Sequence, residues 1–328
     1  MLLTGGTGIV QVHPTRRCNL RCAHCYSKSG PQVTDTTDPE LLGAALHDAA
    51  TLGYQVVSVS GGEPLLFRGL RDLLAAAKRA GMRTSVTTNG MSLTRRRLAE
   101  LDGVLDTVAV SLDGRPETHT AIRRNAAAFD VLHARLPELR RSTIPFGFIC
   151  TLTMANVAEL EFVVGYARKQ GARFVQVHPL EPEGAALINL AGEVPDSREL
   201  SFAVFEAARL AAAHDIPVQL DVVRRTEVAA RPNLFCGGPE TPDAPLASWL
   251  SPVVVETDGT VVPLTYGFPR RFALGSLTER PFAALAADWH PEAFLALCRD
   301  TAARLRDPGP QLVNWYAELL ATAREPVR

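Results

Sequence analysis

The stretch Cys18-Asn19-Leu20-Arg21-Cys22-Ala23-His24-Cys25 decides how the rest of this chain is understood. Its three cysteines are separated by three residues and then by two, so a short loop can turn all three thiolates toward one point. Thiolates are soft ligands that suit zinc or an iron–sulfur cluster. A structural zinc site takes four ligands, whereas a four-iron cluster takes one thiolate per iron. Three thiolates would therefore leave one iron of such a cluster open to another ligand.

The composition is that of a well-packed protein without a strong charge bias. Of the 328 residues 46% are hydrophobic and 21% are charged, and the formal net charge is −1. No general attraction to nucleic acid is expected at that charge, and no apolar run approaches the roughly 20 residues that span a bilayer. Residues 1–6 do not resemble a signal peptide. Six cysteines, three of them crowded, indicate a cytoplasmic metal protein rather than a disulfide scaffold.

Predicted strands and helices alternate along the first 230 residues. Strands are predicted at 8–13, 55–60, 84–88, 107–111, 144–153 and 174–178, with one more at 217–223. Helices are predicted at 38–52, 70–80, 94–101, 126–139, 156–171 (capped by Asn156) and 196–214. This alternation implies parallel strands with right-handed crossovers. Six units fit an open α/β barrel, in which functional groups collect at the C-terminal ends of the strands.

Three motifs fall at those strand ends. The second strand ends in Gly61-Gly62-Glu63-Pro64, where glycines let the backbone approach a ligand and the carboxylate can accept a hydrogen bond from an ammonium group. The third ends in Thr88-Asn89-Gly90, which is also a common turn. In the fourth, Ser111 and Asp113 lie two residues apart and therefore face the same side of an extended backbone. Each motif alone fits a surface turn, but their shared position favours a binding site.

The cysteine spacing and these motifs together resemble those of the radical S-adenosylmethionine (SAM) enzymes. The resemblance implies a partial (β/α)6 TIM barrel in which Cys18, Cys22 and Cys25 hold one [4Fe–4S] cluster, whose free iron binds the amino and carboxylate groups of SAM. The reduced cluster would cleave SAM to a 5′-deoxyadenosyl radical, with electrons from a reductant such as flavodoxin or ferredoxin. The implied SAM-binding residues are His24, Tyr26, Gly61, Gly62, Glu63, Pro64, Asn89, Ser111, Asp113, Arg123, Val177 and His178.

Some of these assignments keep an alternative. The family's arginine that pairs with the SAM carboxylate matches Arg123 by spacing, but Arg124 is adjacent. Val177 and His178 end the strand that packs against adenine in the family, and a core valine and a loop histidine fit the same pattern. Cys150 is expected to be a small core residue.

The segment after residue 230 predicts a second, smaller unit. Residues 231–252 read as a linker, and 251–256 and 261–264 flank an Asp258-Gly259 turn that predicts a β-hairpin. Helices are predicted at 281–287, 291–306 and 311–323. This pattern resembles the SPASM extension of radical SAM peptide maturases. The resemblance implies two domains, a barrel over residues 1–230 and a small α+β SPASM-like domain over 231–328.

The extension lacks the family's cysteines. Cys236 and Gly259 match the pattern, but Leu264 stands where a second cysteine is expected, and only Cys298 follows. The resemblance therefore implies a SPASM-like fold without an auxiliary cluster, with Leu264 packed in its core. The alternative is an incomplete site built from Cys236 and Cys298.

The resemblance favours a ribosomally synthesised peptide as substrate, with cross-linking, epimerisation or oxidation as the outcome. The second interpretation is tailoring of a tetrapyrrole or another small molecule. A hypothesis of a different class is a non-catalytic metal-binding scaffold, against which the intact motifs at Glu63 and Asp113 argue.

Overall fold

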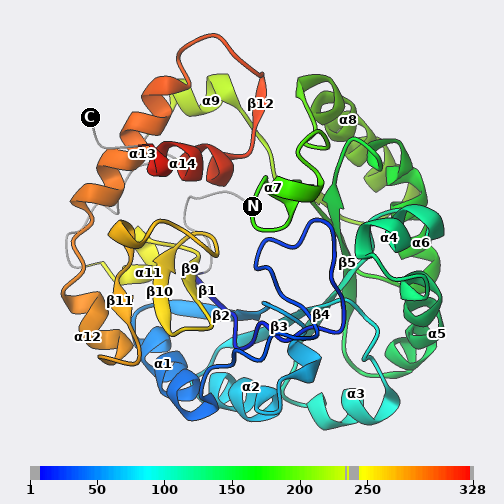
Figure 1. Ribbon diagram of the computed structural model, residues 1–328, viewed down its shortest axis with the longest axis horizontal. Coiled ribbons are helices and arrows are strands. Elements are labelled where there is room, and N and C mark those ends of the chain that lie inside the picture. The colour runs from blue at the N-terminus through cyan, green and yellow to red at the C-terminus, as the bar shows by residue number, and fades with distance from the viewer. Residues whose placement is uncertain (1–7, 233–234, 236–243, 326–328) are drawn as a thin grey trace.

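The structure is a computed structural model that describes residues 8–232, 235 and 244–325. Its centre is one ten-stranded sheet in the order β11-β10-β9-β1-β2-β3-β4-β5-β6-β7. Figure 1 shows the sheet curving around the middle of the molecule, with helices forming the outer rim. The expected mixed α/β fold with a partial barrel is confirmed.

Seven parallel strands form the barrel part of the sheet. They are β1 (Gly8–Val12), β2 (Tyr54–Val59), β3 (Arg83–Thr88), β4 (Thr107–Ser111), β5 (Phe146–Leu152), β6 (Val175–Pro179) and β7 (Val218–Leu220). The larger helices between them are α1 (Pro39–Thr51), α2 (Leu70–Arg79), α3 (Arg95–Leu101), α4 (Pro116–Arg123), α5 (Ala128–Arg141), α6 (Leu160–Gln170) and α8 (Ser197–His214). Shorter elements are η1 (Pro64–Leu66), η2 (Val157–Glu159), α7 (Ala186–Asn189), β8 (Val223–Arg224) and α9 (Arg225–Ala230).

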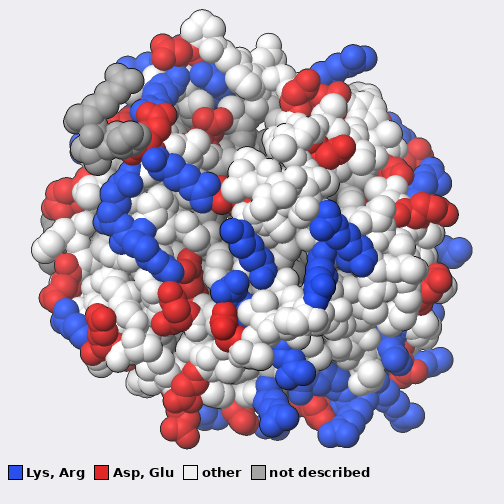
Figure 2. All heavy atoms as spheres, viewed as in Figure 1, with Lys and Arg blue, Asp and Glu red and all other residues white. Residues whose placement is uncertain are grey.

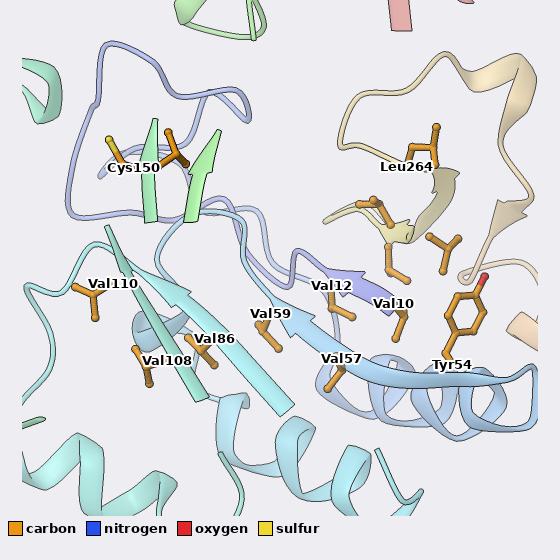
Figure 3. Close-up of a cluster of buried hydrophobic side chains, with 14 of the residues drawn as sticks. Val10, Val12, Tyr54, Val57, Val59, Val86, Val108, Val110, Cys150 and Leu264 are labelled. Atoms are coloured by element: carbon orange, nitrogen blue, oxygen red, sulfur yellow. The ribbon is translucent and has the colours of Figure 1, made fainter. Parts of the chain in front are cut away.

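The two faces of the barrel strands differ in polarity. Val10 and Val12 of β1 are buried beside Val57 and Val59 of β2, and Figure 3 shows these valines directed toward the helices. The alternate positions face the inside of the barrel, because successive residues of a strand point to opposite faces. They include Gln11, Ser58 and Ser85, which are neighbours in register, and Gln176, which is paired with Ile149. Burial of the apolar face therefore stabilises the barrel, and the inner face carries both polar and apolar side chains.

One helix was not predicted, and two local expectations were wrong. Helix α4 was missed, because the face that it buries consists of His119, Ile122 and Arg123 and so lacks apolar periodicity. Asn156 does not cap a helix with its side chain. Its Nδ2 instead donates to the backbone oxygens of Asp113 and Thr151, at 2.7 and 2.8 Å. The helix predicted at 311–323 begins later, because its first residues form strand β12 (Leu312–Val313), which pairs with β8.

The predicted C-terminal hairpin is present and extends the barrel sheet. It consists of β9 (Val253–Val255) and β10 (Thr260–Pro263), and β9 lies parallel to β1. Leu264 follows β10 and is buried, as Figure 3 shows, so its predicted place in the core is confirmed. The remaining elements are α11 (Leu246–Trp249), η3 (Arg270–Phe272), β11 (Gly275–Ser276), α12 (Phe282–Ala287), α13 (Glu292–Arg304) and α14 (Trp315–Arg324).

The structure also shows where cysteines outside the cysteine-rich stretch lie, and whether any described helix could cross a membrane. Cys150 in β5 and Cys298 in α13 are buried in the core. Residues 233–234 and 236–243 of the predicted linker, which include Cys236, lie outside the described residues. Across the part of the chain that is described, no helix is both long and apolar enough to cross a membrane.

Candidate functional site

The three cysteines lie in the loop between β1 and α1, which we call the cysteine loop (residues 13–37). This loop is the dark blue segment near the centre of Figure 1. It folds back on itself, because the backbone N–H of Cys18 donates to the Gly30 oxygen at 3.2 Å and that of Arg16 to the Asp35 oxygen at 3.0 Å. These bonds fix the path of the loop before any ligand is bound.

The glycines after β2 fit against this loop. The N–H groups of Gly62 and Glu63 donate to the oxygens of Thr15 and Arg17, at 2.8 and 2.9 Å. A Cβ on Gly62 would lie 2.3 Å from the Arg17 oxygen, and Gly61 has a φ of +109°, which favours glycine. The close approach that the sequence predicted is therefore made to the cysteine loop of the chain itself. Pro64, also predicted as a site residue, is buried as the first residue of η1.

The Glu63 carboxylate joins the ends of β2 and β3. The side chain is fully buried and accepts hydrogen bonds from Leu65 N (3.0 Å), Thr88 Oγ1 (2.7 Å) and Asn89 N (2.9 Å). Burial raises the pKa of Glu63, while these donors oppose the rise. Its contacts position the next strand end, a role that the sequence did not predict.

Asn89 connects β3 to the first cysteine. Its Nδ2 donates to Asn19 Oδ1 at 2.7 Å and lies 3.8 Å from Cys18 Sγ. The N–H of Leu20 also donates to Cys18 Sγ, at 3.4 Å. Burial raises the pKa of the Cys18 thiol to about 12, so a metal would have to displace its proton on binding.

A buried ion pair lies beside the second cysteine. Arg123 Nε donates to Asp113 Oδ2 at 2.6 Å, and Arg123 Nη1 lies 3.9 Å from Cys22 Sγ. Both side chains are less than 10% exposed. Burial alone would raise the pKa of Asp113, but the Arg123 guanidinium holds it well below its usual range. Arg124, the alternative at this position, is exposed at the end of α4. The geometry therefore favours Arg123 as the cation of this site.

Two histidines complete the surroundings of Asp113. His24 Nε2 lies 3.6 Å from Asp113 Oδ2. His119 Nδ1 accepts a hydrogen bond from the Asp113 N–H at 3.1 Å, which requires an unprotonated Nδ1. Burial lowers the pKa of His119 to about 4, in agreement with a neutral ring. Asp113 is therefore held from several sides and can orient Arg123.

Each of the three thiols has a hydrogen-bond donor near its sulfur atom. For Cys25 Sγ this donor is the N–H of Ser29 at 3.3 Å. Hydrogen bonds to sulfur are one means by which proteins tune iron–sulfur clusters. The residues therefore fit a cluster with three protein ligands.

The other predicted residues surround the barrel mouth. Tyr26 is partly exposed, and its hydroxyl lies 3.2 Å from Ser60 Oγ. Ser111 is in register with Ile149 and so shares the inner face of the sheet. His178 is also on that face and contacts the Asp221 carboxylate, which raises the pKa of His178 although burial alone would lower it.

The Val177 side chain takes no part in that inner face. It is fully buried in the core and in register with Cys150, so only its backbone could meet a ligand. Sequence reasoning also missed Asn19, His119 and Asp221. The first two sit close in sequence to predicted residues, and Asp221 directly follows β7. A search for polar side chains after every barrel strand would have found Asp221.

The segment after β6 closes over the cysteine loop. The N–H of Ala185 donates to the Cys25 oxygen at 2.8 Å, and Asn189 Nδ2 donates to the Ala23 oxygen at 3.2 Å. Residues that follow the C-terminal ends of β2, β3, β4 and β6 therefore all contact this loop. The structure brings the predicted motifs together around the three thiols.

Comparison with known proteins agrees with this arrangement. The pattern of the radical SAM superfamily matches residues 12–166. An Fe-coproporphyrin III synthase of Methanosarcina barkeri is 26% identical over 88% of this chain and 76% of its own length. A PqqA peptide cyclase of Ruegeria pomeroyi is 29% identical over 76% of this chain and 65% of its own length.

Among solved structures, Streptococcus suis SuiB bound to S-adenosylmethionine superposes with a TM-score of 0.67. It is 12% identical, with 89% of this chain and 68% of that chain covered, so the likeness shows the fold. The superfamily uses a [4Fe–4S] cluster and SAM. Residues 12–166 are therefore a radical SAM domain, and the chain as a whole is similar to radical SAM enzymes.

Proposed function

We propose that this protein cleaves SAM reductively and uses the resulting radical to take a hydrogen atom from a substrate. The observation that carries the proposal is the placement of Cys18, Cys22 and Cys25 in one loop, with the buried Asp113–Arg123 pair beside Cys22. When bound, the cluster and SAM supply a 5′-deoxyadenosyl radical.

The chain's own residues have separate roles in this proposal. The three thiolates hold the cluster, and Asp113 orients Arg123. Arg123 Nε donates to Asp113 and Nη1 lies beside Cys22 Sγ, so Nη2 is the group proposed to meet the SAM carboxylate; guanidinium is well suited to that contact. Glu63 is proposed to act near the amino group of SAM while it fixes the position of Asn89. His24, Tyr26, Ser111 and His178 complete the pocket.

We propose a ribosomally synthesised peptide as the substrate. The peptide cyclase relative supports this choice, as does the hairpin β9–β10, whose sequence resembles the extension of peptide maturases. A tetrapyrrole is the second candidate. It is favoured by the Fe-coproporphyrin III synthase, which aligns with a larger share of the chain.

The proposal requires electrons from outside the protein. A flavodoxin or a ferredoxin is the proposed donor. A non-catalytic scaffold would need neither this donor nor the preserved contacts around Asp113, and it would produce no 5′-deoxyadenosine.

The test is anaerobic reconstitution and reduction, followed by measurement of 5′-deoxyadenosine. Wild type should release it from SAM, slowly even without substrate. The variant Cys18→Ala/Cys22→Ala/Cys25→Ala should bind no cluster and release none. An equal yield from the triple variant would rule out the proposed function. Addition of candidate precursor peptides or of coproporphyrin should then identify the substrate class, because the correct one accelerates release above the basal rate.

A further inference from the structure

The cysteine loop carries a local excess of positive charge. Residues 13–34 contain Arg16, Arg17, Arg21 and Lys28 and no Asp or Glu, whereas the whole chain has a net charge of −1. A local excess of one sign is a feature that steers charged partners.

Only one of these four cations has an acidic partner. Arg16 pairs with Asp35 at 2.8 Å. Arg17, Arg21 and Lys28 are exposed, and none of them forms an ion pair with a residue in the described ranges 8–232, 235 and 244–325. Three uncompensated charges therefore remain on the surface of the loop.

The three cations lie around the thiols. Arg17 and Arg21 are adjacent in sequence to Cys18 and Cys22. The backbone of Arg17 also forms an isolated β-bridge with Gly30, and a Cβ on Gly30 would lie 3.7 Å from Arg21 Cγ. The segment that contains Lys28 therefore runs beside both arginines.

Arg124 adds a fourth cation at the edge of this surface. It is exposed at the end of α4, and Ile122 of the same helix accepts a hydrogen bond from Ala23 at 2.8 Å. Figure 2 shows Lys and Arg side chains near the centre of the viewed face, over the place where the cysteine loop runs in Figure 1. We call Arg17, Arg21, Lys28 and Arg124 the cationic face.

We propose that the cationic face is the docking site of an acidic one-electron donor protein. The inference rests on the proposed function, since it assigns a surface to the donor which that function requires. Cys22 and Cys25 are only partly buried, so a protein seated here would bring its redox group close to the thiols. The donor would lose one electron and the centre held by these thiols would gain it, with no bond made or broken.

Electrostatics supports a protein partner in particular. Complementary charges at the rim of an interface raise the association rate and make it sensitive to salt. Arg17, Arg21 and Lys28 are exposed on the loop, where a folded partner can reach them. An anionic small molecule held by the same residues is the competing outcome of the test.

The experiment compares two triple variants with the same change of charge. Arg17→Glu/Arg21→Glu/Lys28→Glu reverses three of the four charges of the cationic face and leaves Arg124 in place. Its control is Arg79→Glu/Arg168→Glu/Lys169→Glu, at the C-terminal ends of α2 and α6. Those residues are exposed, and they lie at the opposite end of the barrel, because each helix leads into the start of the next strand.

The first measurement is the affinity of the reconstituted proteins for an oxidised, acidic flavodoxin at several salt concentrations. The cysteine-loop variant should bind at least tenfold more weakly at low salt and lose most of the salt dependence, while the control variant stays within about twofold of wild type. Reduced methyl viologen, which needs no protein docking surface, should bring all three proteins to the same final extent of reduction.

Other outcomes would overturn the inference. These are unchanged flavodoxin binding by the cysteine-loop variant, equal weakening in the control variant, or loss of coproporphyrin binding with flavodoxin binding intact. If the glutamate variant does not reconstitute, Arg17→Gln/Arg21→Gln/Lys28→Gln replaces it under the same criteria. Wild type that makes no 5′-deoxyadenosine with methyl viologen would contradict the proposed function, whatever the flavodoxin result.

Discussion

The cysteine loop after β1 and the hairpin β9–β10 lie next to each other on paired strands, but they are stabilised by different chemistry. Buried charges and polar groups hold the cysteine loop, notably Glu63 and the Asp113–Arg123 pair. The hairpin buries valines and Leu264, with Leu264 at the position where the SPASM pattern has a cysteine. Buried polar groups thus surround the thiols, whereas in the hairpin they are confined to the turn, where Glu256 and Thr257 are buried and Glu256 pairs with Arg270.

The largest expected effect on stability comes from breaking the buried ion pair. Asp113→Ala would leave the Arg123 guanidinium buried without a partner, which costs about 3–5 kcal/mol of unfolding free energy. Denaturant unfolding of the variant measures this loss. Asp113→Ala/Arg123→Met is the control, and it should recover most of the loss because no lone buried charge remains. A loss of less than about 1 kcal/mol of unfolding free energy in Asp113→Ala would mean that the ion pair contributes little to the stability around the cysteine loop.

The corresponding change in the hairpin removes apolar contacts only. Leu264→Ala should lower the free energy of unfolding by about 2–5 kcal/mol, the usual cost of such a cavity. It should leave the iron content and the SAM affinity unchanged. Loss of iron in this variant, measured alongside unfolding, would show that the two regions are not independent.

Ligand affinity tests the cysteine-loop side directly. Arg123→Ala should weaken SAM binding without removing the cluster. A hydrogen bond to a charged group contributes about 1.5–3 kcal/mol, which corresponds to roughly ten- to hundredfold in affinity. Arg124→Ala is the matched control and should bind SAM as wild type does, because Arg124 is exposed. Equilibrium binding that shows the reverse pattern would reassign the carboxylate contact to Arg124.

The smallest effect concerns His13, which joins the two regions. Its ring is fully buried, stacks on Tyr266 with centroids 4.8 Å apart and lies 5.7 Å from the Tyr26 ring. Neither ring nitrogen has a hydrogen-bond partner among the described residues. Burial lowers the pKa of His13 to about 3. The ring is therefore neutral in the folded protein.

This shift fixes the sign of a pH dependence. Between about pH 3 and 6.5 the unfolded chain binds a proton at His13 that the folded protein does not, so stability falls as the pH is lowered through this window. From pH 7 to 5 the contribution is about 2 kcal/mol. His13→Phe should lose about that much less stability than wild type on the same acidification. Unfolding curves with the same pH slope in both proteins would contradict this account.

The part of the site that could be predicted from sequence is the part encoded by short motifs. The cysteine spacing and the residues after β2, β3 and β4 are local patterns, and the barrel rule brings strand ends together. Contacts between distant segments were not predictable. Nothing near Glu63 in the sequence indicates that its carboxylate accepts hydrogen bonds from Thr88 and Asn89.

The same distinction applies to the fold. The barrel strands were predictable because their buried faces are apolar, whereas α4 was not, because it buries His119 and Arg123. The buried polar side chains of α4 contact Asp113, which lies just after β4. The proposed domain boundary after residue 230 stays a prediction, and the hairpin beyond it is continuous with the barrel sheet.

Iron and sulfide analysis tests most directly whether the redox centre is confined to the cysteine loop. We expect about four irons per chain in reconstituted wild type, since three thiolates and SAM provide one ligand for each iron of one cluster. The variant Cys236→Ala/Cys298→Ala should keep about four irons, and Cys18→Ala/Cys22→Ala/Cys25→Ala should keep almost none. About eight irons in wild type, falling to about four in Cys236→Ala/Cys298→Ala, would contradict the account by revealing a second cluster.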